Sequence, residues 1–291
     1  MESFAGKFAV VTGGGSGMGR ELVRQLAALG CDVAVCDVNA GDLAETIKMA
    51  TGESLSFVTV SHQLCDVSDE EAVRRFADAA LATHGRDHVD LVFANAAIGA
   101  GGSFIKDPRE QWERVFAVNW WGVYYTARVF LPLLIAAPEG VLVNTSSVNG
   151  FWASLGPAWP HTAYSTAKFA VKGFTESLIE DLRVNAPHVT VALVMPGHVA
   201  TNIVGNSLRA FGVTDDEAIA KANAGFRENA PMTAAQAAAV ILDGVRTGRW
   251  RILVGDGAVK LDEFVRANPE AAYDYQELAR HRDLPRPGAA G

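Results

Sequence analysis

The sequence predicts an α/β protein built on a doubly wound, seven-stranded parallel sheet with helices on both faces. Short apolar runs alternate with longer amphipathic segments along most of the chain. Runs that are apolar on both faces are typical of strands buried in a parallel sheet. Connections between parallel strands are right-handed, so a chain that winds outward from its first strand in both directions has the strand order 3-2-1-4-5-6-7.

The elements follow from hydrophobic periodicity and from the residues that begin and end helices. The short apolar runs predict strands at residues 7–12, 31–37, 55–60, 89–95, 140–145, 189–195 and 251–254. The amphipathic segments predict helices at residues 17–29, 40–50, 70–83, 108–136, 164–184 and 233–247. Ser68 or Asp69 is the expected N-cap of the third helix, and Pro138 follows the end of the fourth.

The composition is that of a globular chain with a sizeable core. Of 291 residues, 49% are hydrophobic and 20% are charged, which argues against disorder. The 25 Lys and Arg against 33 Asp and Glu give a net charge of −8, which argues against nucleic-acid binding. Because no linker or repeat interrupts the pattern, we expect one domain over residues 1–255, with a lid at about 197–232. Residues 256–291 should form a tail that frays or packs on a neighbouring subunit.

The remaining sequence signals predict a cytoplasmic protein without a membrane segment. Cys31, Cys36 and Cys65 are too few and too scattered for a disulfide framework or a metal site, so we expect buried thiols in a reducing compartment. The N-terminus lacks the pattern of a signal peptide, and no apolar run approaches the ~18 residues of a membrane span. His161 and His198 have no second ligand at a suitable spacing, so no metal is expected.

A glycine-rich loop follows the first predicted strand. Residues 12–19 have the sequence TGGGSGMG and open the first helix. Glycines allow a tight turn and a close approach of the backbone to a ligand, and the helix N-terminus attracts a diphosphate. The position between a strand and a helix therefore favours dinucleotide binding in a Rossmann-type fold. The expected contacts are Gly13, Gly15, Ser16, Gly17, Met18 and Gly19.

An acidic residue, Asp37, ends the second predicted strand. A carboxylate at this place accepts hydrogen bonds from the adenosine ribose hydroxyls and repels a 2′-phosphate. Its neighbours Ser16, Val38 and Asn39 carry no positive charge for such a phosphate. The sequence therefore favours NAD(H) over NADP(H). The alternative is a solvated carboxylate at the end of a strand.

Tyr164 and Lys168 lie four residues apart in a predicted helix, so their side chains share one face. An ammonium near a phenol lowers its pKa, so this pair suits proton exchange with an alcohol or a ketone. Ser147 ends the fifth strand, at the edge of the sheet where ligands bind, and can hold the substrate oxygen. Ser146 is the alternative for this role, since neighbouring residues of a strand point to opposite faces. Asn119 lies in an apolar run. We expect its buried amide to bond backbone at a helix kink, to form part of a proton relay, or to do both.

Taken in order, these motifs resemble those of single-domain short-chain dehydrogenases/reductases over residues 5–255. TGxxxGxG, Asp37, Asn95-Ala-Ala-Ile-Gly99, Asn119, Ser147, YxxxK and Pro196-Gly197 carry the resemblance. It implies that Tyr164 is the acid/base, that Lys168 lowers its pKa and holds the nicotinamide ribose, that Ser147 orients the substrate and that Asn119 completes a proton relay. Tyr164 and Lys168 thus also count as cofactor-binding residues.

The resemblance further implies homodimers or homotetramers built on the helices of Asn119 and Tyr164. The further cofactor contacts that it implies are Asp66, Val67, Asn95, Ala96, Pro196, Gly197, Val199 and Thr201. Two features depart from the family pattern. The usual NNAG is replaced by residues 95–99, and the 17 positions from Ser147 to Tyr164 exceed the usual spacing.

Aromatic residues gather in the longer loop, and further apolar residues lie in segment 202–232. Such side chains line pockets for apolar ligands, although lid packing or a subunit interface would use them equally well. The expected pocket residues are Ser147, Asn149, Trp152, Trp159 and His198. The sequence thus predicts an NAD-dependent alcohol dehydrogenase or ketone reductase for a bulky apolar or aromatic small-molecule substrate. The alternatives are an NADP(H)-dependent carbonyl reductase, a family isomerase or dehydratase, and a non-catalytic dinucleotide-binding sensor or scaffold.

Overall fold

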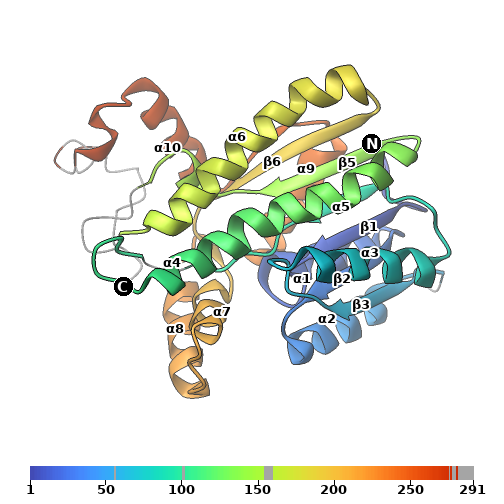
Figure 1. Ribbon diagram of the computed structural model, residues 1–291, viewed down its shortest axis with the longest axis horizontal. Helices are drawn as coiled ribbons and strands as arrows, with labels where there is room; N and C mark the ends of the chain where they lie inside the picture. The colour runs from blue at the N-terminus through green and yellow to red at the C-terminus, as the bar shows by residue number, and fades with distance from the viewer. Residues whose placement is uncertain (56, 100–101, 154–159, 275, 277–279, 281–291) are drawn as a thin grey trace.

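The computed structural model describes residues 1–55, 57–99, 102–153, 160–274, 276 and 280. This part of the chain forms a seven-stranded parallel sheet in the order β3-β2-β1-β4-β5-β6-β9, which confirms the predicted topology (Figure 1). The last strand is β9 because the short strands β7 and β8 lie outside this sheet. The strands are β1 (Phe8–Thr12), β2 (Asp32–Asp37), β3 (Val60–Leu64), β4 (Leu91–Ala94), β5 (Gly140–Thr145), β6 (Val189–Pro196) and β9 (Arg251–Val254).

Helices cover both faces of the sheet, because the strands bury alternate residues on opposite sides. Ala9 and Val11 of β1 belong to one apolar cluster, whereas Phe8 and Val10 belong to the other. The first cluster is closed by α1 (Gly17–Ala28), α2 (Ala40–Glu53) and α9 (Ala234–Arg246). The second is closed by α3 (Glu70–His84), α4 (Arg109–Phe116), α5 (Gly122–Ala136) and α6 (Thr162–Asn185). Asp69, and not Ser68, caps α3 by accepting a hydrogen bond from the Glu71 N–H.

Two elements differ from the sequence expectations. The third strand lies at Val60–Leu64 and not at 55–60, because this edge strand is only partly buried and tolerates polar residues. Phe57, in the apolar run that suggested a strand, is 68% exposed. The fourth helix is interrupted by a π-helical turn, η1 (Ala117–Trp121), so that α4 and α5 are separate elements.

The expected lid region contains two helices that project from the body (Figure 1). They are α7 (Ile203–Ala210) and α8 (Asp216–Glu228), and they lie between β7 (Val199–Ala200) and β8 (Met232–Thr233), which pair with each other. No helix of the described residues is long and apolar enough to span a bilayer.

The described residues after 255 form helical structure where we expected a tail, and residues 281–291, where that tail ends, lie outside the described residues. This segment begins as the helix α10 (Asp256–Ala267) and continues to a short 3-10 turn, η3 (Ala271–Tyr273). Leu261 and Phe264 of α10 pack with Ala272 against Trp152 of the same chain. Asp262 of α10 forms an ion pair with Arg251 of β9. This segment is thus docked on its own domain, because its apolar face finds a partner there.

Candidate active site and cofactor site

The glycine-rich loop lies between β1 and α1 at the carboxyl edge of the sheet. Gly13 and Gly17 have positive φ angles of 65° and 55°, a conformation that favours glycine. A Cβ atom on Gly19 would lie 2.1 Å from the Gly13 carbonyl oxygen. The loop therefore depends on these glycines for its shape.

The start of α1 suits an anionic ligand. Ser16 is its N-cap residue but makes no side-chain capping bond, and the first turn contains no acidic residue. The first N–H groups of a helix have no intrahelical partner, and the helix dipole adds positive charge there. These features fit the diphosphate of a dinucleotide. Met18, in the same turn, packs against the apolar cluster beneath.

Asp37 lies directly beside this loop. Its carboxylate accepts hydrogen bonds from the Gly15 N–H at 2.9 Å and from the Asn39 N–H at 3.1 Å. A Cβ atom on Gly15 would lie 2.9 Å from the carboxylate, so glycine permits this approach. The structure thus brings the predicted ribose-binding carboxylate to the phosphate-binding loop.

Asn95 and Ala96 hold the loop from the neighbouring strand β4. The Asn95 amide donates to the carbonyl oxygens of Thr12 and Gly13, at 3.1 and 3.3 Å. The backbone N–H groups of Asn95 and Ala96 both donate to the Thr12 hydroxyl. Asn95 therefore supports the cofactor site by fixing the backbone of the loop.

Asp66 and Val67, two further residues expected to contact the cofactor, follow the carboxyl end of β3. Asp66 accepts hydrogen bonds from the Ser68 hydroxyl and from Arg114 of α4. Burial alone would raise the pKa of Asp66, but these hydrogen bonds outweigh it and hold the pKa below its usual value. Arg114 is a supporting residue that the sequence analysis did not identify.

The lid closes over the other side of the glycine loop. Gly197 donates its N–H to the Val254 carbonyl oxygen, Val199 is buried in β7, and Thr201 lies against Gly17. Asn206 of α7 donates a 3.0 Å hydrogen bond to the Ser16 hydroxyl. We did not predict a role for Asn206, because nothing near it in the sequence marks it as a partner of the loop.

Lys168, Tyr164 and Ser147 lie together at the end of β5. Lys168 is fully buried, and its Nζ donates to the Thr145 carbonyl oxygen at 2.9 Å. The same Nζ lies 5.5 Å from the centre of the Tyr164 ring. The Ser147 hydroxyl lies near enough to the Tyr164 phenol to affect its pKa. The Ser146 hydroxyl instead donates to the Lys168 carbonyl oxygen at 2.7 Å.

Burial determines the proton affinities of this group. It lowers the pKa of Lys168 to about 7. It also raises the pKa of Tyr164, and the Ser147 hydroxyl only partly offsets this. We expected the ammonium to lower the pKa of Tyr164, but desolvation is the larger effect here. The phenol is therefore held protonated, ready to donate a proton.

Asn119 lies in the π-helical turn and is fully buried. Its amide nitrogen donates to the carbonyl oxygens of Ile98 and Val115, both at 2.8 Å. Its Oδ1 atom is buried without a hydrogen-bond partner. The amide is thus bonded to backbone at the helix interruption, as one interpretation of the sequence expected, and the proton relay stays a prediction.

The predicted substrate pocket is only partly assembled from the expected residues. Trp152 is 2% exposed and packs on the C-terminal segment, so it stands behind the site and does not line it, contrary to our expectation. Asn149 is also buried, and its amide donates to the Trp152 carbonyl oxygen. The His198 ring bonds the Phe226 carbonyl oxygen of α8. Trp159 lies outside the described residues.

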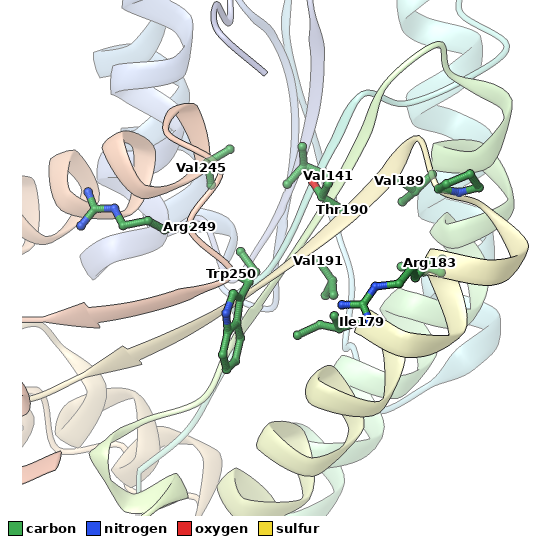
Figure 2. Close-up of a pocket in the computed structure, with 13 residues that line it drawn as sticks. Val141, Ile179, Arg183, Val189, Thr190, Val191, Val245, Arg249 and Trp250 are labelled. Atoms are coloured by element: carbon green, nitrogen blue, oxygen red, sulfur yellow. The ribbon is translucent and has the colours of Figure 1, made fainter. Parts of the chain in front are cut away.

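A cavity of about 250 Å³ lies away from this chemistry. Its lining includes Val141 and Val189, which begin β5 and β6, so it opens at the amino edge of the sheet. Figure 2 shows Ile179 and Arg183 of α6 facing Trp250 there. Because ligands of open α/β sheets bind at the carboxyl edge, we do not assign the reaction to this cavity.

Comparison with known proteins places this geometry in context. A family model described as short chain dehydrogenase matches residues 7–210. The SadH protein of Mycobacterium tuberculosis is 38% identical over 91% of this chain and 92% of its own length. A human epidermal retinol dehydrogenase is 34% identical over 69% of this chain and 63% of its own. A short-chain dehydrogenase/reductase from Burkholderia phymatum, solved with NAD, has a TM-score of 0.80 and 30% identity, covering 93% of this chain and 96% of that one.

Proposed function

Because the chain belongs to the short-chain dehydrogenase/reductase family, and is therefore an oxidoreductase, we propose that it interconverts a secondary alcohol and a ketone with NAD(H). The observation that carries this proposal is the cluster of Tyr164, Ser147 and Lys168 at the carboxyl edge of β5. This cluster lies at the same edge of the sheet as the glycine loop, which is proposed to bind the dinucleotide. The remote alternative within the family, an isomerase or dehydratase, has no supporting observation.

Each side chain of the cluster has a separate role in the proposal. Tyr164 donates its proton to the ketone oxygen in reduction and accepts it from the alcohol in oxidation. Ser147 holds the same substrate oxygen beside the phenol. Lys168, whose Nζ lies 5.5 Å from the centre of the Tyr164 ring, binds the nicotinamide ribose. Asn119 provides the acceptor Oδ1 for a water that links Lys168 to solvent. The bound nicotinamide supplies or accepts the hydride.

The preference for NAD(H) rests on Asp37. Its carboxylate is directed at the loop, where it would meet a 2′-phosphate with unfavourable charge. Other cofactor contacts proposed are Gly13, Gly15, Ser16, Gly17, Met18, Gly19, Asp66, Val67, Asn95, Ala96, Pro196, Gly197, Val199 and Thr201. An NADP(H)-dependent reductase is the alternative, since a metagenomic relative with 31% identity and a TM-score of 0.58, covering 66% of this chain and 83% of that one, was solved with NADP.

We also propose a bulky apolar or aromatic alcohol as the substrate class. Phe104 and Ile105, in the loop that follows β4, are 77% and 92% exposed near the start of α6. The substrate named for the human relative, retinol, is of this type. The chain is proposed to act in the cytoplasm as a homodimer or homotetramer, through the faces of η1 and α6 that expose Trp121 and Phe169. Residues 1–255, with the lid at 197–232, are proposed as the catalytic domain.

The proposal is tested by offering the protein a panel of secondary alcohols, from small aliphatic to steroid-sized and aryl compounds, with NAD⁺ or NADP⁺. Formation of the reduced cofactor is followed by absorbance. We expect turnover with NAD⁺ on bulky alcohols. Tight binding of NADH without turnover of any member would instead support the non-catalytic sensor or scaffold. Tighter binding of NADPH than of NADH would overturn the role given to Asp37.

A further inference from the structure

Trp152 connects the reactive serine to the C-terminal segment, defined here as α10 and η3 (residues 256–273). The Trp152 indole N–H donates a buried 2.7 Å hydrogen bond to the Ala272 carbonyl oxygen. Its ring packs with Leu261, Phe264 and Ala272. The Ala153 N–H adds a bond to the Tyr273 hydroxyl at 3.1 Å. The C-terminal segment therefore holds residues 152 and 153, which follow Ser147 in the chain, in place.

A short 3-10 turn, η2 (Val148–Gly150), transmits this position to Ser147. The Asn149 amide donates to the Trp152 carbonyl oxygen at 3.0 Å. The Asn149 backbone N–H donates to the Ser147 hydroxyl at 3.1 Å. All three of these side chains are less than a tenth exposed, so neither bond competes with solvent. Only four residues thus separate Trp152, which the C-terminal segment fixes, from Ser147.

The C-terminal segment also supports the opposite wall of the site. Asp262 of α10 is bound to Arg251 of β9, which anchors the helix to the sheet. A Cβ atom on Gly197, a proposed nicotinamide contact, would lie 3.6 Å from Ala258 of α10. The chain that follows Ser147 and the chain around Gly197 therefore both contact α10.

We propose that the C-terminal segment is a part of the active site, and that Trp152 is a positioning residue that sets the Ser147 hydroxyl relative to Tyr164. The inference rests on the proposed function, since it assigns Ser147 a task in binding the substrate oxygen. A hydroxyl displaced by a fraction of an ångström no longer holds that oxygen in the line of proton transfer. Trp152 touches neither substrate nor cofactor and acts through Asn149 and Ser147.

The test is a double-mutant cycle on the full chain with Trp152→Phe and Ser147→Ala. Phenylalanine keeps an aromatic ring in the cluster, but it removes the N–H donor to Ala272 and part of the buried indole volume. We expect Trp152→Phe to lower kcat/KM for the best alcohol about tenfold while the Kd for NADH stays within about twofold. In the Ser147→Ala background, measured at high enzyme concentration, the same substitution should change kcat/KM less than about twofold.

The control is Trp250→Phe, a partly exposed tryptophan at the amino edge of the sheet, which should leave kcat/KM unchanged. Equal effects of Trp152→Phe with and without the serine would overturn the inference, because a merely structural role acts independently of Ser147. An unchanged kcat/KM in Trp152→Phe would do the same. A wild-type protein that binds NADH but turns over no alcohol would overturn the proposed function first, and this inference with it.

Discussion

The side-chain amide of Asn206 donates a 3.0 Å hydrogen bond to the hydroxyl of Ser16. Asn206 belongs to the lid helix α7, and Ser16 is the residue at which the glycine loop becomes α1. The two are 190 positions apart in the sequence. The expected lid is therefore bonded to the loop for which we propose binding of the cofactor phosphates.

Loss of this bond should weaken cofactor binding. One intramolecular hydrogen bond contributes about 1 kcal/mol, so Asn206→Ala should raise the Kd for NADH about fivefold. Fluorescence titration of NADH measures it. Asn229→Ala is the control, because that amide bonds only the Gly225 carbonyl oxygen of its own helix, away from the loop. Equal Kd values for Asn206→Ala and the wild type would show that the lid does not act on the cofactor.

Removal of the phenol should abolish the reaction and spare the binding. Tyr164→Phe loses the group that transfers the proton, which is worth about a thousandfold in rate. We expect kcat to fall by at least this factor, while NADH titration gives a Kd close to that of the wild type. Tyr125→Phe, which alters a partly buried ring stacked on Trp121, should retain full activity. An active Tyr164→Phe protein would rule out the proposed proton transfer.

A change at Asp37 should alter the choice of cofactor. Asp37→Ser removes the charge that repels a 2′-phosphate and the acceptor for the Gly15 N–H. The ratio of Kd values, NADPH over NADH, should fall at least about tenfold. Asp32→Asn, at the other end of β2 and paired with Arg86, should leave this ratio unchanged. Titration of each protein with both nucleotides decides between these outcomes.

The buried Lys168 should leave a signature in the dependence of stability on pH. Its pKa falls from an ordinary 10.5 to about 7 on burial. Between these values the unfolded chain binds the proton and the folded chain does not, so the contribution of Lys168 to stability grows as pH rises and is lost as pH falls to about 7. In urea unfolding, the free energy of unfolding of the wild type should therefore rise relative to that of Lys168→Met from about pH 7 to 10. Below about pH 7 the difference between the two proteins should be constant. A difference that is constant throughout would show that burial does not lower the pKa of Lys168.

Two glycine substitutions should have opposite effects. Gly19→Ala places a Cβ atom 2.1 Å from the Gly13 carbonyl oxygen and 2.7 Å from the Asn95 amide, so the loop must shift. We expect a loss of about 2 kcal/mol in the free energy of unfolding and weaker NADH binding. Gly173→Ala, in α6, meets nothing within 4 Å and should stabilise the protein by about 0.5–1 kcal/mol. Thermal unfolding of both variants, with NADH titration, tests this contrast.

The sequence was most informative about features that depend on the residue pattern within a single strand or helix. The central strands were found because they are apolar on both faces, and Tyr164 and Lys168 because helical spacing places them together. The edge strand β3 was misplaced because Ser61, His62 and Gln63 pair through their backbones while none of their side chains is fully buried.

Contacts between distant segments could not be predicted in this way. Trp152 was expected to line the pocket, but its indole binds Ala272, 120 residues further along the chain. Asn206 was not identified at all, since its partner Ser16 belongs to another element. The pKa of Tyr164 was expected in the wrong direction because burial cannot be read from residue spacing.

The π-helical turn η1 changes the direction in which the side chains of α5 point relative to those of α4. A π turn holds one residue more than an α turn, and each residue of a helix advances the side chains by about 100°. Trp112 of α4 donates to the Thr162 hydroxyl, and Trp121, the last residue of η1, stacks on Tyr125 of α5. The π turn rotates the side chains of α5 by about one residue relative to those of an uninterrupted α-helix, so the directions of Trp112 and Tyr125 do not follow from a single helical spacing.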